Sequence, residues 1–187
     1  MRDRLPPLPD ERLTEEQRRV AEAIARGPRG AVYGPFVPLL RSPELADCAQ
    51  RLGEYLRFRS AIGPRLTELA ILVIARHWNQ TVEWAIHAPL AEQAGIAAAT
   101  IAAIAAARRP AQLSDDEATI YDFCVELGRD KSVGDATFAR AVTRFGERGV
   151  VDLVGINGYY TLLAMVLNVA GTPAGSTPSI ALMPDAS

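Results

Sequence analysis

Residues 64–77 read PRLTELAILVIARH, and this stretch decides which class of fold the chain can adopt. Its apolar residues recur at the three-, four-, seven- and eight-residue spacings of one α-helix face. That face comprises Leu66, Leu69, Ala70, Val73, Ile74 and, further along, His77. Gly63 and Pro64 interrupt the chain just before it. We therefore predict a helix from about residue 64 to residue 77.

Helix signals dominate the rest of the chain as well, and no segment shows a convincing period-2 strand pattern. Thr14 and Ser114 each open a capping box, and Asp135 is expected to cap a later helix. Pro89 lies inside one predicted helix and should kink it just beyond His87. The predicted helices cover residues 14–26, 42–59, 64–77, 80–94, 97–107, 114–127, 135–145 and 150–167. The sequence therefore predicts an all-α fold.

Glycines and prolines divide the chain into three segments. Residues 1–41 should form an N-terminal helix followed by a Gly/Pro-rich arm, which contains Gly30, Gly34, Pro35 and Pro38. Residues 42–170 hold the main run of helix signals and should form one helical domain. Residues 171–187 carry few order signals and are expected to be an extended tail.

The composition is that of an ordinary globular protein. The 187 residues are 49% hydrophobic and 22% charged, with a net charge of −2. A nucleic-acid-binding chain usually carries a basic stripe, and the composition does not suggest one, so no nucleic-acid partner is expected. The charged, proline-broken start is unlike a secretory signal, and the two cysteines form no CxxC pair. We therefore expect a cytoplasmic protein.

Residues 150–167 form an apolar run whose length is at the lower limit for crossing a bilayer. Asp152, Gly155, Asn157 and Gly158 interrupt the run, which favours a buried helix over a membrane span. A helix that is apolar all round needs cover on every side. We therefore predict that it lies in the core or at a subunit interface of a homo-oligomer, without membrane contact.

The candidate chemistry centres on His87, one of only two histidines. Glu83 lies four residues earlier, a spacing that places both side chains on one helix face. A carboxylate beside an imidazole can orient the ring and raise its pKa, which keeps a proton available. The alternative is a surface pair that contributes roughly a few tenths of a kcal/mol, and the spacing leaves both open. The other histidine, His77, is interpreted as a packed or partly exposed residue.

Together with Glu68 on the preceding helix, the spacing is Glu68-x11-Gln80-x2-Glu83-x3-His87. This spacing resembles the carboxymuconolactone decarboxylase/alkylhydroperoxidase D superfamily, whose peroxidase branch carries Glu-x11-Cys-x2-Cys-x3-His. The likeness covers roughly residues 40–170 and includes RLTELAIL at 65–72 and VEWAIHAP at 82–89. The resemblance implies an alkylhydroperoxidase D-like helical fold and a homo-oligomer, commonly a trimer or a hexamer.

The chain departs from the peroxidase branch at the two cysteine positions, which Gln80 and Glu83 occupy. Peroxide reduction needs a thiolate nucleophile and a resolving thiol within reach, and Cys48 and Cys124 lie outside the motif. A dithiol peroxidase is therefore not expected. The Glu-Trp-x-x-His form is similar to the decarboxylase branch, which acts on gamma-carboxymuconolactone in aromatic catabolism and uses no metal or organic cofactor.

The resemblance also implies roles for these residues. Such a decarboxylase must spread electrons into the lactone carbonyl and then deliver a proton to carbon. We expect His87 to be that acid and Glu83 to orient it, while Glu68 shares the proton network or anchors the loop. Because unpaired carboxylates are costly to bury, an acidic substrate also needs cations. The candidate substrate-binding residues are Arg65, Arg76, Gln80, Trp84 and Phe36, the last on an arm that could cover the pocket from its own or a neighbouring subunit.

Three other functions stay open from the sequence. One is a lactone hydrolase or isomerase of the same fold. Another is a non-catalytic small-molecule-binding or stress-response module that kept the fold and lost the chemistry. The third is a divalent-metal site built from Glu68, Glu83 and His87, a ligand set that suits several ions but that the family resemblance argues against.

Overall fold

The computed structural model describes residues 2–174, and within that range the chain is all-helical, as predicted. A short 3-10 turn (Asp10–Arg12) precedes the α-helices. These are α1 (Glu15–Arg26), α2 (Phe36–Leu39), α3 (Pro43–Phe58), α4 (Pro64–His77), α5 (Thr81–Gln93), α6 (Ala98–Ala105), α7 (Asp115–Asp130) and α8 (Asp135–Ala170). Most of the segment predicted to be an extended tail, from residue 175 onward, lies outside the described residues.

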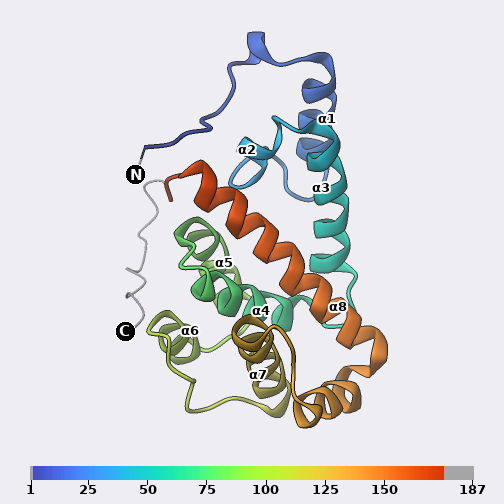
Figure 1. Cartoon of the computed structure of the whole chain (residues 1–187), viewed down its shortest axis with the longest axis vertical. Coiled ribbons are helices and arrows are strands. Elements are labelled where there is room, and N and C mark those ends of the chain that lie inside the picture. The colour runs from blue at the N-terminus through green and yellow to red at the C-terminus, as the bar shows by residue number, and fades with distance from the viewer. Residues whose placement is uncertain (1, 175–187) are drawn as a thin grey trace.

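Helix α4 is the centre of the fold. It packs against α3, α5, α6, α7 and α8, and every residue from Leu66 to Arg76 is buried. Figure 1 shows α8 running diagonally across the molecule, with α3 on one side of it and α4 to α7 on the other. The sequence predicted a single apolar face for α4. Ile71, Leu72 and Ala75 are buried as well, because neighbouring helices cover α4 on every side.

Two helix starts form as predicted. Thr14 accepts a hydrogen bond from the Gln17 backbone and Ser114 from the Glu117 backbone, and both reciprocal side-chain bonds are present. The prediction for Asp135 is wrong by one residue, since Gly134 is the N-cap of α8 and Asp135 is the first helical residue. A carboxylate in the first turn still stabilises the helix start, because it faces the positive end of the helix dipole.

The helices predicted over 135–145 and 150–167 are the two halves of α8. They meet at Gly146, whose φ of 68° and ψ of 173° are not helical. Glycine adopts a positive φ without the steric cost of a Cβ, so the chain can change direction there. The second half buries Leu153 and Ile156, whereas Val151 and Val154 are exposed.

Among the described residues, α8 is the one helix that is long and apolar enough to cross a membrane. That criterion uses length and composition alone, and the core helix of a soluble protein also meets it. Of the apolar 18-residue window, 56% is buried inside the fold. This burial agrees with the prediction of a helix that contributes to the core.

The N-terminal segment belongs to the same hydrophobic core as the rest of the chain. Val20 and Ile24 of α1 are buried in it, together with Phe36 of α2. The arm predicted as a loop contains α2, which packs on α3 and α8, and Gly34 lies next to Ile86 of α5. The arm therefore covers part of α5 and α8 of its own chain.

Candidate functional site

Helices α4 and α5 bring Glu68, Glu83 and His87 together in the protein interior. Nδ1 of His87 lies 2.6 Å from a carboxylate oxygen of Glu68, and Nε2 lies 3.4 Å from Oε2 of Glu83. All three side chains are buried. The structure therefore brings together the three residues that the sequence singled out, and the alternative of a surface Glu–His pair is wrong.

Together with Arg57 of α3, these side chains form a row of charged groups in the order Arg57, Glu68, His87 and Glu83. The Arg57 guanidinium lies 3.3 Å from Oε1 of Glu68, whose other oxygen contacts His87. Glu68 is thus held between a guanidinium and an imidazole, an arrangement that fixes the ring and favours a proton on Nδ1. The ring nitrogen Nε2 is then left facing Glu83. Edge-on contact with the Tyr160 ring, at a centroid separation of 5.3 Å, further restricts the imidazole.

Glu83 is the least compensated member of the group. Its Oε1 atom is buried and has no hydrogen-bond partner among residues 2–174. Burial raises the pKa of the Glu83 carboxyl above its usual value, although His87 and Arg57 act in the opposite direction. Glu83 therefore holds a proton to higher pH than an exposed glutamate does. A buried carboxyl with one unused oxygen can give a proton to, or take one from, a molecule placed beside it.

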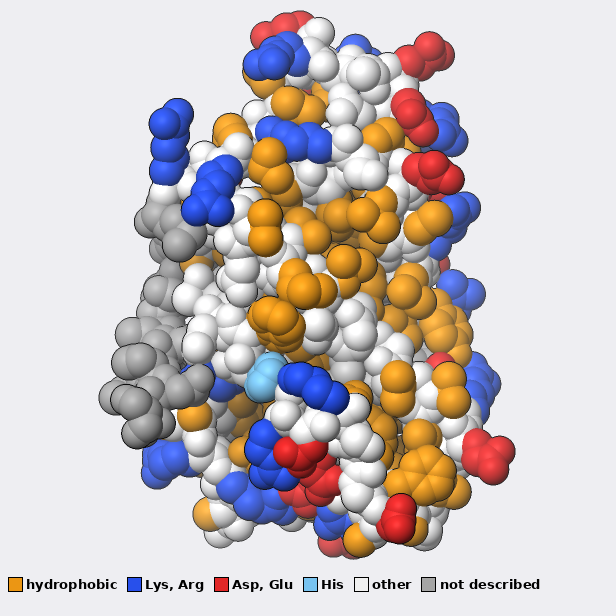
Figure 2. Space-filling view, viewed as in Figure 1, with side chains coloured by type: hydrophobic (Ala, Val, Ile, Leu, Met, Phe, Trp, Pro, Cys, Tyr) orange, Lys and Arg blue, Asp and Glu red, His pale blue; other side chains and the backbone are white. Residues whose placement is uncertain are grey.

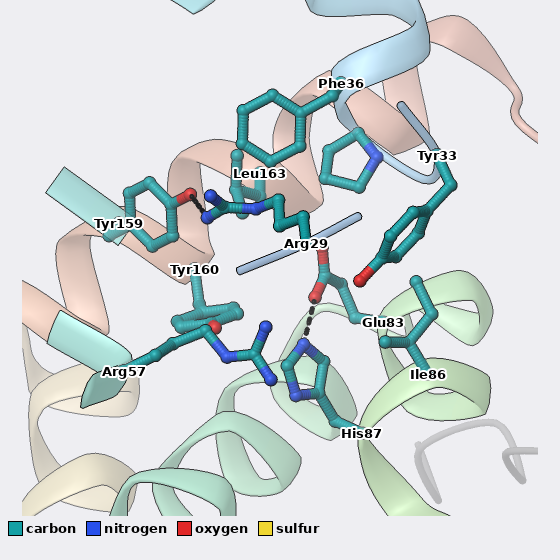
Figure 3. A pocket seen from close by; sticks show the side chains of 11 residues that line it. Arg29, Tyr33, Phe36, Arg57, Glu83, Ile86, His87, Tyr159, Tyr160 and Leu163 are labelled. Atoms are coloured by element: carbon teal, nitrogen blue, oxygen red, sulfur yellow. Dashed lines mark hydrogen bonds and ion pairs between the residues drawn. The ribbon is translucent and has the colours of Figure 1, made fainter. Parts of the chain in front are cut away.

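A small hollow lies beside Glu83, with a volume of about 30 Å³. Figure 3 shows Glu83 between Arg29 and His87, with Tyr33 facing it across the hollow. The walls come from the arm and from helices α2, α3, α5 and α8. The lining residues are Arg29, Tyr33, Pro35, Phe36, Arg57, Glu83, Ile86, His87, Tyr159, Tyr160 and Leu163. This volume is enough for a water molecule but far below the roughly 300–1,000 Å³ of ordinary ligand pockets.

Arg29 is held firmly in the wall of this hollow. It donates to the Gln50 carbonyl at 3.2 Å and to the Tyr159 hydroxyl at 3.3 Å, and its guanidinium lies 4.5 Å from the centroid of the Phe36 ring. Cation–π contact and two hydrogen bonds together fix the side chain. Phe36, a predicted site residue, thus lines the hollow and also supports Arg29.

Two tyrosines of α8 complete the polar lining. Burial raises the pKa of Tyr159 to about 12 and that of Tyr160 well above the usual value of a phenol. Both side chains therefore remain neutral hydroxyls near neutral pH. A neutral phenol can donate a hydrogen bond to an oxygen that gains negative charge.

Two predicted substrate contacts of α5 lie elsewhere. Gln80 is the N-cap of α5, where its side chain accepts from the Val82 backbone and donates to Asn168 of α8 at 2.8 Å. Trp84 is 1% exposed and belongs to the hydrophobic core. Neither lines the hollow. The turn of 100° per residue points Trp84 away from Glu83. Gln80 lies one turn before Glu83 on the same side of the helix, but its side chain is engaged at the N-cap and by Asn168.

The two predicted arginines of α4 do not line the hollow either. Arg65 pairs with Glu117 of α7 at 2.5 Å, and Arg76 donates to the Ala105 carbonyl at 3.0 Å and to Asn79. Both were candidates for substrate binding because they lie close to Glu68 in the sequence. The packing of α4 against α6 and α7 instead gives them partners on those helices. Arg29 and Arg57 line the hollow instead, and no motif or periodicity in the sequence indicated them.

Among residues 2–174, no group of three or more histidine, cysteine, aspartate or glutamate side chains is arranged to hold a metal ion. Glu68 and Glu83 contact opposite nitrogens of the His87 ring. Their carboxylates are therefore separated by the imidazole and do not converge on one point, as ligands of a common ion must.

The comparisons with known proteins add no family assignment. No protein-family model matches the sequence, and no curated protein matches it. The resemblance to the carboxymuconolactone decarboxylase superfamily therefore stays a prediction from the motif spacing.

Proposed function

We propose that this protein is a cofactor-independent proton-transfer enzyme, similar to 4-carboxymuconolactone decarboxylase, that acts on a small carboxylated lactone or a related metabolite. The observation that carries the proposal is the buried Glu83 oxygen without a hydrogen-bond partner, at the end of a fixed row of charges and beside a hollow. Buried polar atoms are nearly always satisfied, and exceptions concentrate at functional sites.

The geometry supports a division of roles that differs from the one expected from the sequence. Arg57 fixes Glu68, and Glu68 fixes His87 through Nδ1. His87 then faces Glu83, which lines the hollow with its raised pKa. Glu83 is the proton donor in this scheme, and His87 returns a proton to it. Glu68 is a positioning residue.

In this scheme the reaction has two steps, loss of carbon dioxide and then protonation of carbon. The bond between the ring carbon and the carboxylate breaks, carbon dioxide leaves, and the electron pair moves into the conjugated carbonyl of the lactone. Tyr159 and Tyr160 are the hydroxyl donors available to stabilise the resulting oxyanion. Glu83 then gives its proton to carbon, and the Glu83 carboxylate takes up a proton from solvent through His87.

Recognition of an acidic substrate falls to Arg29. Arg57 already neutralises Glu68, whereas Arg29 donates to a carbonyl and a hydroxyl and contacts an aromatic ring, all of them uncharged. Arg29 therefore brings a positive charge to the hollow that a substrate carboxylate can neutralise. Because the hollow of about 30 Å³ is much smaller than the roughly 300–1,000 Å³ of ordinary ligand pockets, we expect the arm to move when a substrate binds.

The assay for this proposal uses the purified full chain with gamma-carboxymuconolactone, and it measures carbon dioxide release. The expected result is turnover by the wild type and a large loss in both Glu83→Gln and His87→Asn. Arg65→Gln is the control, because Arg65 lies outside the hollow. Absence of turnover in the wild type would exclude this substrate. Full activity of Glu83→Gln would exclude Glu83 as the donor.

We also propose that the chain forms a homo-oligomer, a trimer or a hexamer, through an apolar face shared by α3 and α8. Figure 2 shows hydrophobic side chains gathered along the middle of one side of the molecule. The exposed large apolar residues of α3 and of the part of α8 that follows Gly146 are Leu45, Leu52, Phe58, Val151, Val154, Met165 and Val169. A cluster of large exposed apolar side chains favours association between chains.

The oligomer is tested by light scattering on size-fractionated protein. Val154→Asp should shift the mass toward that of the 20.2 kDa monomer. Phe138→Asp is a matched control, because Phe138 is equally exposed, at 48%, but lies before Gly146. A monomeric wild type, or equal dissociation by both variants, would contradict the proposal.

A further inference from the structure

A second hollow lies between α4, α6 and α7, and it shares no lining residue with the first. Its volume is about 190 Å³, about six times that of the hollow beside Glu83. We call it the α4–α7 cleft. Its lining residues are Val73, Arg76, His77, Ile104, Ala107, Tyr121, Cys124, Val125 and Arg129.

The basic residues that line the α4–α7 cleft have no acidic counterpart among its described lining residues. These basic residues are Arg76, His77 and Arg129. Arg76 is 5% exposed and is held by the Ala105 carbonyl. The Arg129 side chain is 68% exposed and pairs with the exposed Asp130 at 2.5 Å, a surface pair that a ligand carboxylate can replace. Arg76 and His77 also take part in other interactions, so only their position and their capacity for positive charge matter here.

The remaining walls are apolar or neutral. Val73, Ile104 and Val125 present aliphatic surface, and Tyr121 adds an aromatic ring. Burial raises the pKa of the Cys124 thiol to about 12, so the thiol stays protonated and brings no negative charge to the cleft. A ligand must therefore combine an apolar body with an anionic group. An uncharged ligand would gain no charge-assisted hydrogen bond from the guanidinium groups.

We propose that the α4–α7 cleft binds a small organic acid, with its carboxylate at Arg76 and Arg129 and its apolar body against Val73 and Ile104. A carboxylate matches the planar guanidinium group and forms charge-assisted hydrogen bonds with it. The apolar body of the acid gains from removal of its surface from water. This site is independent of the chemistry proposed at Glu83.

Benzoate is a suitable probe, with benzamide as the neutral molecule of nearly the same shape. Titration of the ¹⁵N-labelled full chain, followed by NMR, should shift amide signals of α4, α6 and α7. Benzamide should bind at least about tenfold more weakly, because it lacks the charge-assisted hydrogen bonds. Glu83→Gln should bind benzoate as the wild type does, which separates this test from the test of the proposed reaction.

Arg129→Gln should weaken benzoate binding by about two- to fourfold, since it removes one exposed cation. Arg140→Gln is the matched control, because Arg140 is also an exposed arginine but does not line the cleft. Equal binding of benzamide and benzoate would overturn the proposal. So would shifts confined to residues around His87, equal weakening by both arginine variants, or no shift of the wild type at all.

Discussion

The hollow beside Glu83 and the α4–α7 cleft differ in volume, charge and cover, and α4 contributes to them through different faces. By the helical turn of 100° per residue, His77 lies about 180° round the α4 axis from Glu68. The hollow beside Glu83 measures about 30 Å³, contains a buried carboxyl and is covered by the arm. The α4–α7 cleft measures about 190 Å³ and is lined by cationic and apolar residues. One helix thus supplies a positioning residue to the first and part of a wall to the second.

The two hollows differ in whether the charged groups around them are buried or exposed to solvent. Around Glu83, charged groups are removed from water and must compensate one another, which produces the fixed row from Arg57 to Glu83. Around the α4–α7 cleft, Arg129 is exposed and pairs with the exposed Asp130, so it can exchange this partner for a ligand. The first arrangement is suited to a set reaction geometry, and the second to reversible binding of an anion.

The largest expected effect tests the buried row. Glu68→Ala leaves Arg57 and His87 without their shared carboxylate, so we expect the free energy of unfolding to fall by about 3–5 kcal/mol. Urea denaturation measures it. Asp116→Asn, which breaks an exposed pair with Arg144, should lower it by less than about 1 kcal/mol. Equal losses would mean that the row is not a buried, coupled unit.

The next effect concerns Arg29, the cation proposed to recognise an acidic substrate. Arg29→Gln should lower kcat/KM by about 10- to 100-fold, because a charge-assisted contact with the substrate is lost. Arg65→Gln should change it by less than about twofold, since its charge is outside the hollow and partly screened. Steady-state kinetics distinguishes the two. A larger loss in Arg65→Gln would reverse the assignment.

Two glycines of the arm provide a matched pair. Gly30 and Gly34 have φ angles of +72° and +56°, so alanine at either position should lower the free energy of unfolding by about 1–2 kcal/mol. Gly34→Ala should cost more, because its new Cβ would lie 3.2 Å from Cδ1 of Ile86, whereas Gly30 has open space. Benzoate binding in the α4–α7 cleft should not change. Equal stability of the two variants would show that the arm does not press on α5.

The smallest expected effect is a change in how the free energy of unfolding depends on pH. The folded-state pKa of Glu83 is raised above its usual 4.5, so the folded chain binds more protons there than the unfolded chain. This contribution to stability is present below pH 4.5 and is lost as the pH rises through the folded-state pKa. Glu83→Gln should therefore flatten the decline in the free energy of unfolding above pH 4.5. An unchanged slope across denaturation curves at several pH values would mean that Glu83 is charged in the folded protein.

Local signals predicted the helices well. The capping boxes at Thr14 and Ser114 and the period of α4 depend on residues within one or two turns, and all three predictions are confirmed. The i, i+4 spacing of Glu83 and His87 likewise placed both on one face of α5. The family assignment, the substrate and the oligomer stay predictions.

The sequence by itself determined the all-α class, the central helix and the pairing of Glu83 with His87, because each depends on spacing along a single helix. Only the tertiary structure decided which charged side chains lie near Glu83 and His87. Arg29 and Arg57 reach the hollow because the arm and α3 pack over α5 and α8. Arg65 is instead engaged by Glu117 on α7. Helix periodicity says which way a side chain points, but only the packing of helices far apart in sequence determines its partner.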